Sequence, residues 1–379
     1  MPTLLKINNP IARKPRILVA PLDWGLGHAT RCIPIIKELI ICKCEIWIAA
    51  IGDQKALLEK EFPFLSFVEL PGYHIEYDKN RAFTLLRLMG SIPKILIRIK
   101  EENRWLQQFR EQTELDAVIS DNRYGLWGKG IYSVLITHQL GLRTSLGSWM
   151  DRWIQRRHYR LIERFSTCWV PDMEQGSGLA GKLSHPLRMP SVPTRYIGLL
   201  TRMEGLAQAE GGVVDLLVLL SGPEPQRTIL ERRILGQLGA FSGKVVLVRG
   251  LPRGGGPLEG DLRDVEVHDH LPARALNEML LRTKLVVARA GYSTVMDLVR
   301  LEKKAILIPT PGQTEQEYLG KYLSDKKIAF CTKQAGFSLA DALVEVEKFS
   351  FIPVGEERHL LQDAIAALLE KVNPSLLST

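Results

Sequence analysis

A strand that leads into a glycine-bearing turn and then a helix restricts the fold of this chain most, because the pattern occurs twice. The first copy has an apolar strand at residues 16–21, a turn at 23–27 and a helix that starts near His28. The second copy has a strand at 214–220 and, after another turn, a helix at 226–238. Such a unit opens doubly wound α/β domains. Its repetition predicts two similar domains.

Apolar runs typical of buried strands alternate with helical patterns through the N-terminal half. Further strand-like runs lie at 44–51, 65–70, 117–120, 133–137 and 166–171, and helical patterns include 33–41 and 53–62. This alternation favours a mostly parallel sheet covered on both faces. We place an N-terminal domain at 1–198, a polar linker at 199–212 and a C-terminal domain at 213–379. A final helix at 357–372 either stays with the second domain or folds back to the first.

Composition favours a cytoplasmic protein. The five cysteines are scattered and form no Cys-x-x-Cys pair, which is typical of reduced thiols. We expect no signal peptide, because residues 1–14 lack an apolar core. We also expect no membrane span, because no uncharged apolar run approaches ~18 residues. No cofactor and no nucleic-acid partner are predicted.

Positive charge is concentrated in the first half of the chain. The net charge is +8, and residues 1–198 carry +9 while residues 199–379 carry −1. This asymmetry indicates either an anionic partner, such as a membrane surface, or solvated surface charge. The basic, apolar segment 81–100 either lies in a bilayer interface or covers the sheet, and Pro93 is expected to break or kink it. We therefore predict a cytoplasmic protein. Peripheral attachment to the inner face of the cytoplasmic membrane stays open as an alternative.

A histidine in the first glycine-bearing turn is the leading catalytic candidate. Gly25 and Gly27 let the backbone turn tightly and approach a ligand. The positive end of the following helix disfavours a charged imidazole, so His28 should be a neutral base near pH 7. The pattern is not a dinucleotide fingerprint, because its third glycine is missing. The alternative is that His28 is only a solvated helix cap.

Polar loops follow two later strands of the same half. They span residues 120–125 and 137–140, at the carboxyl ends of strands, where open α/β sheets bind ligands. Asp121 is suited to orient His28 or to receive its proton. Alternatively, Asp121 and Asn122 only form turns.

The C-terminal half carries its polar residues in three turns. The helix start at 291–294 suits phosphate, and Ser221 and Gly222 offer further hydroxyl and N–H groups. The carboxylates of Asp297 and Glu315 and the amide of Gln316 suit the vicinal diols of a ribose or a hexose. These turns are also suited to cap helices, with Thr294 paired to Asp297 and Thr314 paired to Glu317. Both interpretations can hold, because a capped helix start is itself an anion site.

These signatures resemble those of the GT-B glycosyltransferases, and most closely glycosyltransferase family 28, which includes the lipid II N-acetylglucosaminyltransferase. The residues that carry the resemblance are 25–28 with Arg31, 288–297 and 309–318. The resemblance implies an α/β fold of the GT-B type, with two Rossmann-like domains facing a central cleft. Departures are Asp297, where the family commonly has glutamate, and the prolines at 223 and 225.

The resemblance also implies a role for each matching residue. His28 would face the acceptor, Asp297 the ribose, Glu315 and Gln316 the sugar, and the loop 268–271 the uracil. In the absence of a metal, helix N-termini, hydroxyl groups and arginines would bind the diphosphate and offset its charge. Catalytic residues are expected to be His28 and Asp121. The UDP-sugar site is expected to comprise Gly27, Ser221, Gly222, Arg227, His270, Leu271, Arg289, Gly291, Tyr292, Ser293, Thr294, Asp297, Glu315 and Gln316.

The predicted activity is inverting, metal-independent transfer of a hexose from a UDP-sugar to a hydroxyl acceptor, with a lipid-linked acceptor as one option. Residues 25–32 also resemble the loop of the UDP-sugar hydrolases of nonulosonic acid biosynthesis, in which a histidine activates water. A non-catalytic protein that binds a nucleotide-sugar is the third hypothesis.

Overall fold

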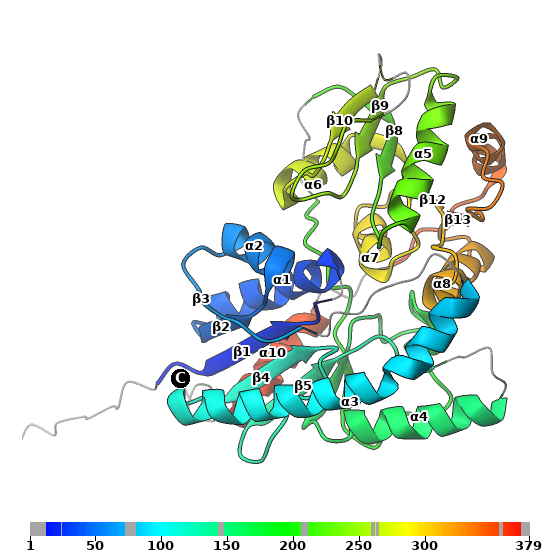
Figure 1. Ribbon diagram of the computed structural model, residues 1–379. Coiled ribbons are helices and arrows are strands. Elements are labelled where there is room, and N and C mark those ends of the chain that lie inside the picture. The colour runs from blue at the N-terminus through cyan, green and yellow to red at the C-terminus, as the bar shows by residue number, and fades with distance from the viewer. Residues whose placement is uncertain are drawn as a thin grey trace, which may run out of the picture.

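The computed structural model describes residues 13–23, 25–72, 81–142, 148–205, 211–258, 262, 265–355 and 359–372, with 81–92 and 148 described by their backbone alone. Within these ranges the strands form two parallel sheets, one in each half of the chain (Figure 1). The predicted α/β class with two Rossmann-like units is therefore confirmed.

The first sheet has the strand order β3-β2-β1-β4-β5-β6-β7 among the described residues. Its strands are β1 (Arg16–Pro21), β2 (Glu45–Ala49), β3 (Ser66–Val68), β4 (Ala117–Asp121), β5 (Tyr132–Ile136), β6 (Thr167–Val170) and β7 (Thr194–Tyr196). The order reverses at β1, whose neighbours are β2 and β4. Ligands of open α/β sheets bind beside such a reversal, at the carboxyl ends of the strands.

The second sheet repeats this arrangement with the order β10-β9-β8-β11-β12-β13 in the part of the chain that is described. Its strands are β8 (Val214–Leu219), β9 (Val245–Val248), β10 (Val265–His268), β11 (Thr283–Ala288), β12 (Lys304–Leu307) and β13 (Phe330–Cys331). Here the reversal lies at β8, between β9 and β11. The two copies of the strand–turn–helix pattern therefore occupy equivalent places in the two sheets.

Helices cover both faces of each sheet. In the first half they are α1 (Leu26–Ile41), α2 (Gly52–Glu61), α3 (Arg81–Gln112) and α4 (Ser148–Ile162). In the second half they are α5 (Gln226–Leu238), α6 (Ala273–Leu281), α7 (Tyr292–Arg300), α8 (Thr314–Asp325), α9 (Leu339–Lys348) and α10 (Leu360–Val372). Figure 1 shows α1 and α2 on one side of the first sheet and α3 and α4 on the other.

The alternation of side chains in β1 explains this layering. Ile17 and Val19 belong to the buried cluster that contains the apolar face of α1. Leu18 and Ala20 point the other way and join Leu106 of α3. A strand places successive side chains on opposite faces, so β1 is apolar from Ile17 to Pro21 because both of its faces are covered there.

The last helix packs on the first half of the chain. Gln362 Nε2 of α10 donates a hydrogen bond to Glu38 Oε1 of α1, at 2.9 Å. Leu361 and Leu368 of α10 share a buried cluster with Ile36 of α1. Figure 1 shows α10, in red, behind the first sheet. Helix α10, the last described element, thus lies beside α1 of the first half.

Two details differ from the sequence prediction. Strand β7 at Thr194–Tyr196 was not predicted and adds an edge to the first sheet just before the linker. The helix is not broken at Pro93, since α3 continues through it from Arg81 to Gln112.

Helices in the described ranges are too short or too polar to cross a bilayer.

Candidate active site

The two halves of the chain meet where the starts of α1 and α7 lie close together. Ser293 Oγ, in the first turn of α7, donates a hydrogen bond to the carbonyl oxygen of Gly27 in α1, at 3.1 Å. A Cβ atom on Gly27 would lie 3.0 Å from that hydroxyl oxygen, closer than ordinary contact. Glycine at 27 therefore permits the close approach of the two helix starts, which Figure 1 shows at the centre of the molecule.

His28 follows Gly27 in the first turn of α1 and faces Asp121 at the end of β4. Its Nδ1 atom lies 2.9 Å from Asp121 Oδ2, and 16% of its side chain is exposed. The strand register explains the proximity, because Asp121 pairs with Pro21 at the end of β1. The predicted catalytic residues are thus brought together by adjacent parallel strands, and the carboxylate is placed to orient the imidazole.

Arg31 completes this cluster, although the sequence analysis assigned it no role. It lies one helical turn after His28 and is 2% exposed. Its Nε donates to Asp121 Oδ2 at 2.7 Å, and its Nη2 donates to Asp121 Oδ1. Such a two-pronged contact is the strongest arginine–carboxylate geometry. The spacing of three residues on a helix was the signal that His28 and Arg31 share a face.

The charges in this cluster set the protonation states. Burial opposes ionisation of Asp121, but Arg31 and His28 outweigh it and lower its pKa to about 2, so it is a carboxylate at neutral pH. Burial and the charge of Arg31 lower the pKa of His28, against the opposing effect of Asp121. His28 is therefore neutral near pH 7, as predicted. The principal causes are burial and Arg31, whereas the sequence analysis had assigned the effect to the helix end.

Glu315, predicted to contact the sugar, reaches across to the first half of the chain. His138 Nε2 lies 2.7 Å from Glu315 Oε1, and Gln139 Nε2 donates to Glu315 Oε2. Tyr292 also faces this way, because its ring stacks on His138 with centroids 4.2 Å apart and its hydroxyl donates to the carbonyl of Pro171 at 2.8 Å. The side chain of Tyr292 is therefore engaged within the protein, which leaves only its backbone to contact a UDP-sugar. Glu315 lies where the two halves of the chain meet.

Arg289 joins three turns at the carboxyl ends of the second sheet. Its Nη2 donates to the carbonyl of Gln226 at 2.6 Å and its Nη1 to that of Ile308 at 3.3 Å. It is 1% exposed, and its Nε has no hydrogen-bond partner among the described residues. Burial lowers the pKa of Arg289 to about 10. A buried guanidinium bonded to carbonyl groups suits an anionic ligand better than a packed interior.

Arg227, also predicted to meet the diphosphate, is committed elsewhere. It is buried, with Nη1 2.9 Å from Glu231 Oε2 and Nε 2.5 Å from Glu224 Oε1. Arg249 contacts the same Glu231 and reaches Asp269, at 2.8 and 2.7 Å. This network ties α5 to the loop after β10. The charge of Arg227 is thus balanced by carboxylates, and its placement on the diphosphate stays a prediction.

The residues predicted around the base and the ribose border the segment after β7. His270 is half-buried, and burial together with the charges of Arg202 and Lys60 lowers its pKa. Asp297 Oδ1 accepts a hydrogen bond from Thr201 Oγ1 at 2.5 Å. Burial raises the pKa of Asp297 to about 6, despite the opposing charge of Arg202. The neighbouring Leu271 is buried.

The remaining predicted residues line the turns before α5, α7 and α8. Gly222 has φ 100°, a left-handed conformation that favours glycine, and Ser221 beside it is half-buried. Gln316 Oε1 accepts from the backbone N–H of Thr310 at 2.9 Å, and its Nε2 donates to Gln313. Gln316 therefore holds its own turn together before any sugar contact.

The two capping pairs expected from the sequence are not formed. Gly291 precedes α7 and Gln313 precedes α8, and neither position has a side-chain cap. Glu317 accepts instead from the backbone N–H of Gly312, at 3.1 Å. The first amides of α7 and the hydroxyl of Thr294 are thus not paired in a capping box, which leaves a helix N-terminus suited to an anion.

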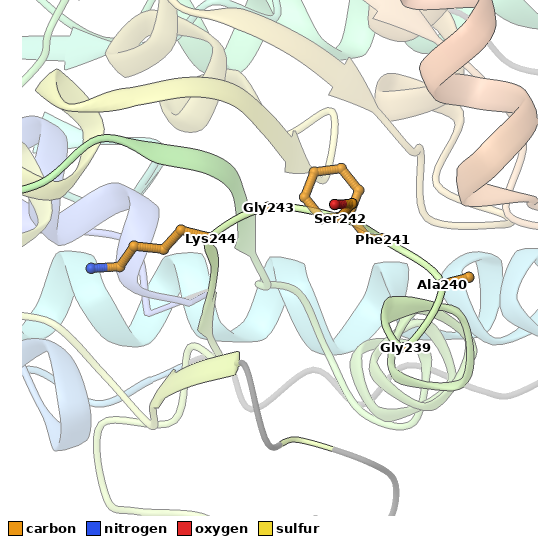
Figure 2. Close-up of a pocket in the computed structure, with 6 residues that line it drawn as sticks. All are labelled: Gly239, Ala240, Phe241, Ser242, Gly243 and Lys244. Carbon is orange, nitrogen blue, oxygen red and sulfur yellow. The ribbon is translucent and has the colours of Figure 1, made fainter.

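A separate pocket of about 580 Å³ lies away from this site (Figure 2). It is lined by Gly239, Ala240, Phe241, Ser242, Gly243 and Lys244, which connect α5 to β9. That loop stands at the amino ends of the strands, opposite the convergent turns. None of the predicted site residues lines it. Among the described residues, no group of three or more His, Cys, Asp or Glu is arranged to hold a metal ion.

Known proteins resemble this chain in sequence. Residues 265–351 match the glycosyltransferase family 28 C-terminal domain. The chain is 25% identical over 349 residues to the UDP-N-acetylglucosamine--N-acetylmuramyl-(pentapeptide) pyrophosphoryl-undecaprenol N-acetylglucosamine transferase of Mannheimia succiniciproducens, which covers 89% of this chain and 90% of that protein. The enzyme of the same name from Rickettsia felis is 37% identical over 82 residues, 20% of this chain and 23% of that protein.

Solved structures resemble it in fold. The glycosyltransferase of kitacinnamycin superimposes with a TM-score of 0.63 at 14% identity, covering 96% of this chain and 100% of that one. MurG of Acinetobacter baumannii gives a TM-score of 0.50 at 13% identity, with 96% and 95% covered.

The fold and the family 28 domain together define this chain as a glycosyltransferase of the GT-B fold. Within that class it resembles glycosyltransferase family 28 and, in particular, the lipid II N-acetylglucosaminyltransferases.

Proposed function

We propose that this enzyme transfers a hexose from a UDP-sugar to a hydroxyl acceptor, with inversion at the anomeric carbon and with His28 as the general base. The observation that carries the proposal is the placement of His28. It lies 2.9 Å from the Asp121 carboxylate, and the preceding Gly27 is hydrogen-bonded to the first turn of α7. A base supported in this way stands next to the helix that would hold the leaving phosphate.

The donor is proposed to be a UDP-sugar, an N-acetylhexosamine by analogy with the relatives' names. Its diphosphate would lie at the uncapped start of α7 and near Arg289, whose buried charge bonds to carbonyls. Ser221 and Thr294 supply hydroxyl donors nearby. These groups oppose the negative charge that develops on UDP as it leaves. The donor is proposed to bind without a metal.

The reaction moves one proton and exchanges one bond. As the acceptor oxygen attacks the anomeric carbon, His28 Nε2 takes the hydroxyl proton, and the bond from carbon to UDP breaks with its electron pair on UDP. Asp121, ionised at neutral pH, stabilises the imidazolium that forms. Attack from the face opposite UDP inverts the configuration.

The acceptor is proposed to be lipid-linked and to be reached at an anionic membrane surface. Adjacent helices α3 and α4 expose large apolar side chains, namely Leu96, Ile97, Trp149 and Trp153. Exposed basic side chains accompany them at Lys94, Lys100, Arg152, Arg156, Arg157 and Arg160. The helices pack together through Ile95, Ile99 and Leu161, in a cluster that includes Leu22 beside the active-site turn. We call these exposed residues the α3/α4 surface.

This composition is typical of an interface with anionic lipid, where tryptophans and cations lie among the headgroups. The predicted basic segment began at residue 81, and the side chains of 81–92 lie outside the described residues. The described part of the surface extends onto α4, which the sequence analysis did not identify. A peripheral position at the inner face of the cytoplasmic membrane is proposed on this basis.

Product analysis tests the proposed activity. The enzyme is incubated with UDP-sugars, with and without a membrane lipid extract, and both UDP release and the fate of the sugar are followed. Sugar transferred to lipid supports the proposal. Quantitative free sugar in the absence of lipid would instead identify a hydrolase. UDP binding without turnover in either mixture would contradict both enzymatic assignments.

A further inference from the structure

The Nδ1 atom of His28 lies within hydrogen-bond distance of two groups with opposite requirements. Asp121 Oδ2, at 2.9 Å, can only accept, and Arg31 Nη2, at 2.8 Å, can only donate. A neutral imidazole carries one ring proton, so Nδ1 either donates to Asp121 or accepts from Arg31. The first arrangement leaves Nε2 without a proton. The second puts the proton on Nε2 and abolishes the base.

Asn122 offers Arg31 Nη2 a second acceptor besides His28. Arg31 Nη2 has two hydrogens, and one of them is donated to Asp121 Oδ1. In the orientation that satisfies the Asn122 amide, its nitrogen donates to Thr137 Oγ1 at 2.9 Å and to the carbonyl of Ile136 at 3.3 Å. The amide oxygen then accepts from Arg31 Nη2 at 3.2 Å. Both Nη2 hydrogens are thereby taken, and His28 Nδ1 is left to donate to Asp121.

The backbone fixes the position of this amide. Asn122 directly follows Asp121 and has φ 55°, the left-handed conformation that asparagine tolerates better than most residues. Its N–H donates to the carbonyl of Ile136 at 3.0 Å, which continues the pairing of β4 with β5. The side chain is therefore anchored at the same sheet edge as the carboxylate beside it.

We propose that Arg31 and Asn122 act together as positioning residues that hold His28 with its proton on Nδ1, so that Nε2 is free to take the proton of the acceptor. The inference rests on the proposed role of His28 as the base. Arg31 contributes the fork that orients Asp121, and Asn122 accepts the hydrogen that would otherwise turn toward the imidazole. The other charged or titratable groups that act on His28 are His138, after β5, and Glu315 of α8.

Nitrogen NMR measures the tautomer directly, because the ¹⁵N shifts of a ring nitrogen differ between its protonated and bare states. Signals of His28 in the ¹⁵N-labelled protein are assigned by their loss in His28→Ala. The expected spectrum has a protonated Nδ1 and a bare Nε2 near pH 7. A protonated Nε2 in the unaltered protein would overturn the proposal.

Asn122→Gly is the matched variant, because glycine adopts φ 55° without strain and removes only the amide. We expect the population with the proton on Nε2 to rise, and kcat to fall by about tenfold or more, since a wrong tautomer at a catalytic histidine costs up to ~10⁴-fold. The KM for the donor should not change. An unchanged NMR tautomer and an unchanged kcat in this variant would refute the role of Asn122.

Two further variants separate positioning from a simple structural effect. Asn122→Asp keeps an acceptor for Arg31, so it should retain more kcat than the glycine variant. Its added negative charge should move the acid limb of the pH profile to higher pH. Arg31→Lys keeps a charge but loses the fork, so its kcat should fall with the tautomer shift. Failure of the proposed function is a separate result, because His28→Ala would then remain active whatever the NMR tautomer is.

Discussion

Ser293 Oγ and the carbonyl oxygen of Gly27 are 3.1 Å apart, and this contact joins the first turn of α7 to the first turn of α1. It brings the uncapped N-terminus of α7 next to the histidine that follows Gly27. The site is thus formed where α1, which follows β1 of the first sheet, meets α7, which follows β11 of the second sheet.

Gly27→Ala tests this contact. Alanine favours a helix by about 1 kcal/mol over glycine, which offsets part of the cost of overpacking at this contact. Its Cβ would lie 3.0 Å from Ser293 Oγ, so the serine hydroxyl must give way by a few tenths of an ångström and its bond to Gly27 is disturbed. We expect kcat/KM to fall roughly tenfold, as overpacking by about 1–3 kcal/mol would predict. Gly27→Ala combined with Ser293→Ala should recover part of the loss, and equal activity of the single and double variants would argue against the contact.

The protonation of Asp297 should make the free energy of unfolding depend on pH. Its pKa is raised to about 6 in the folded protein, above the usual value of 3.8. The folded state therefore binds more protons between these values, and the free energy of unfolding should fall as pH rises from 4 to 6. The expected loss is about 1–3 kcal/mol. Denaturant unfolding at several pH values should show a shallower slope for Asp297→Asn, and identical slopes would contradict the assignment.

Variants of Asp297 and Gln316 test which part of the UDP-sugar each residue contacts. Asp297→Ala should weaken binding of UDP itself, whereas Gln316→Ala should weaken the UDP-sugar and leave UDP binding unchanged. Isothermal titration calorimetry with both ligands makes the comparison. Donor binding should persist in EDTA, and complete loss on chelation would reject the metal-free site. If both variants bind UDP as the unaltered enzyme does, the ribose assignment is wrong.

The α3/α4 surface is predicted to bind anionic vesicles. Each basic residue near such a surface contributes roughly 1 kcal/mol, so Arg156→Gln with Arg157→Gln should reduce binding by about tenfold or more. The matched control exchanges two exposed arginines of the second half, Arg232 and Arg274, for glutamine. Sedimentation with phosphatidylglycerol vesicles at low salt measures the difference. Equal losses in the two double variants would rule out a specific surface.

The sequence predicted the sheets well and the site only in part. The strand at 16–21 and the helix at 226–238 were found with the same bounds, because continuous apolar runs end at glycine- and proline-bearing turns. The proximity of His28 and Asp121 was predicted because parallel strands end at one edge. The actual separation of the two side chains depends on the pairing of β1 with β4, which no local sequence pattern encodes.

Contacts made by packing were not predictable. Arg31 bonds to a carboxylate 90 residues away, and Glu315 bonds to His138, 177 residues away. Arg227 resembled a free phosphate ligand in the sequence, yet it is neutralised by Glu231 one helical turn later on α5. An arginine at a turn has the same sequence appearance whether its partner is a ligand or an internal carboxylate.

The turnover of His28→Ala, measured beside its affinity for UDP, tests the central claim most directly. General base catalysis contributes about 10²–10⁴-fold, so kcat with the productive acceptor should fall by that factor. The dissociation constant for UDP should stay the same, because its proposed ligands lie in the second half of the chain. A variant that binds UDP normally and keeps full turnover would show that His28 is not the base, even with the fold and the donor site as described.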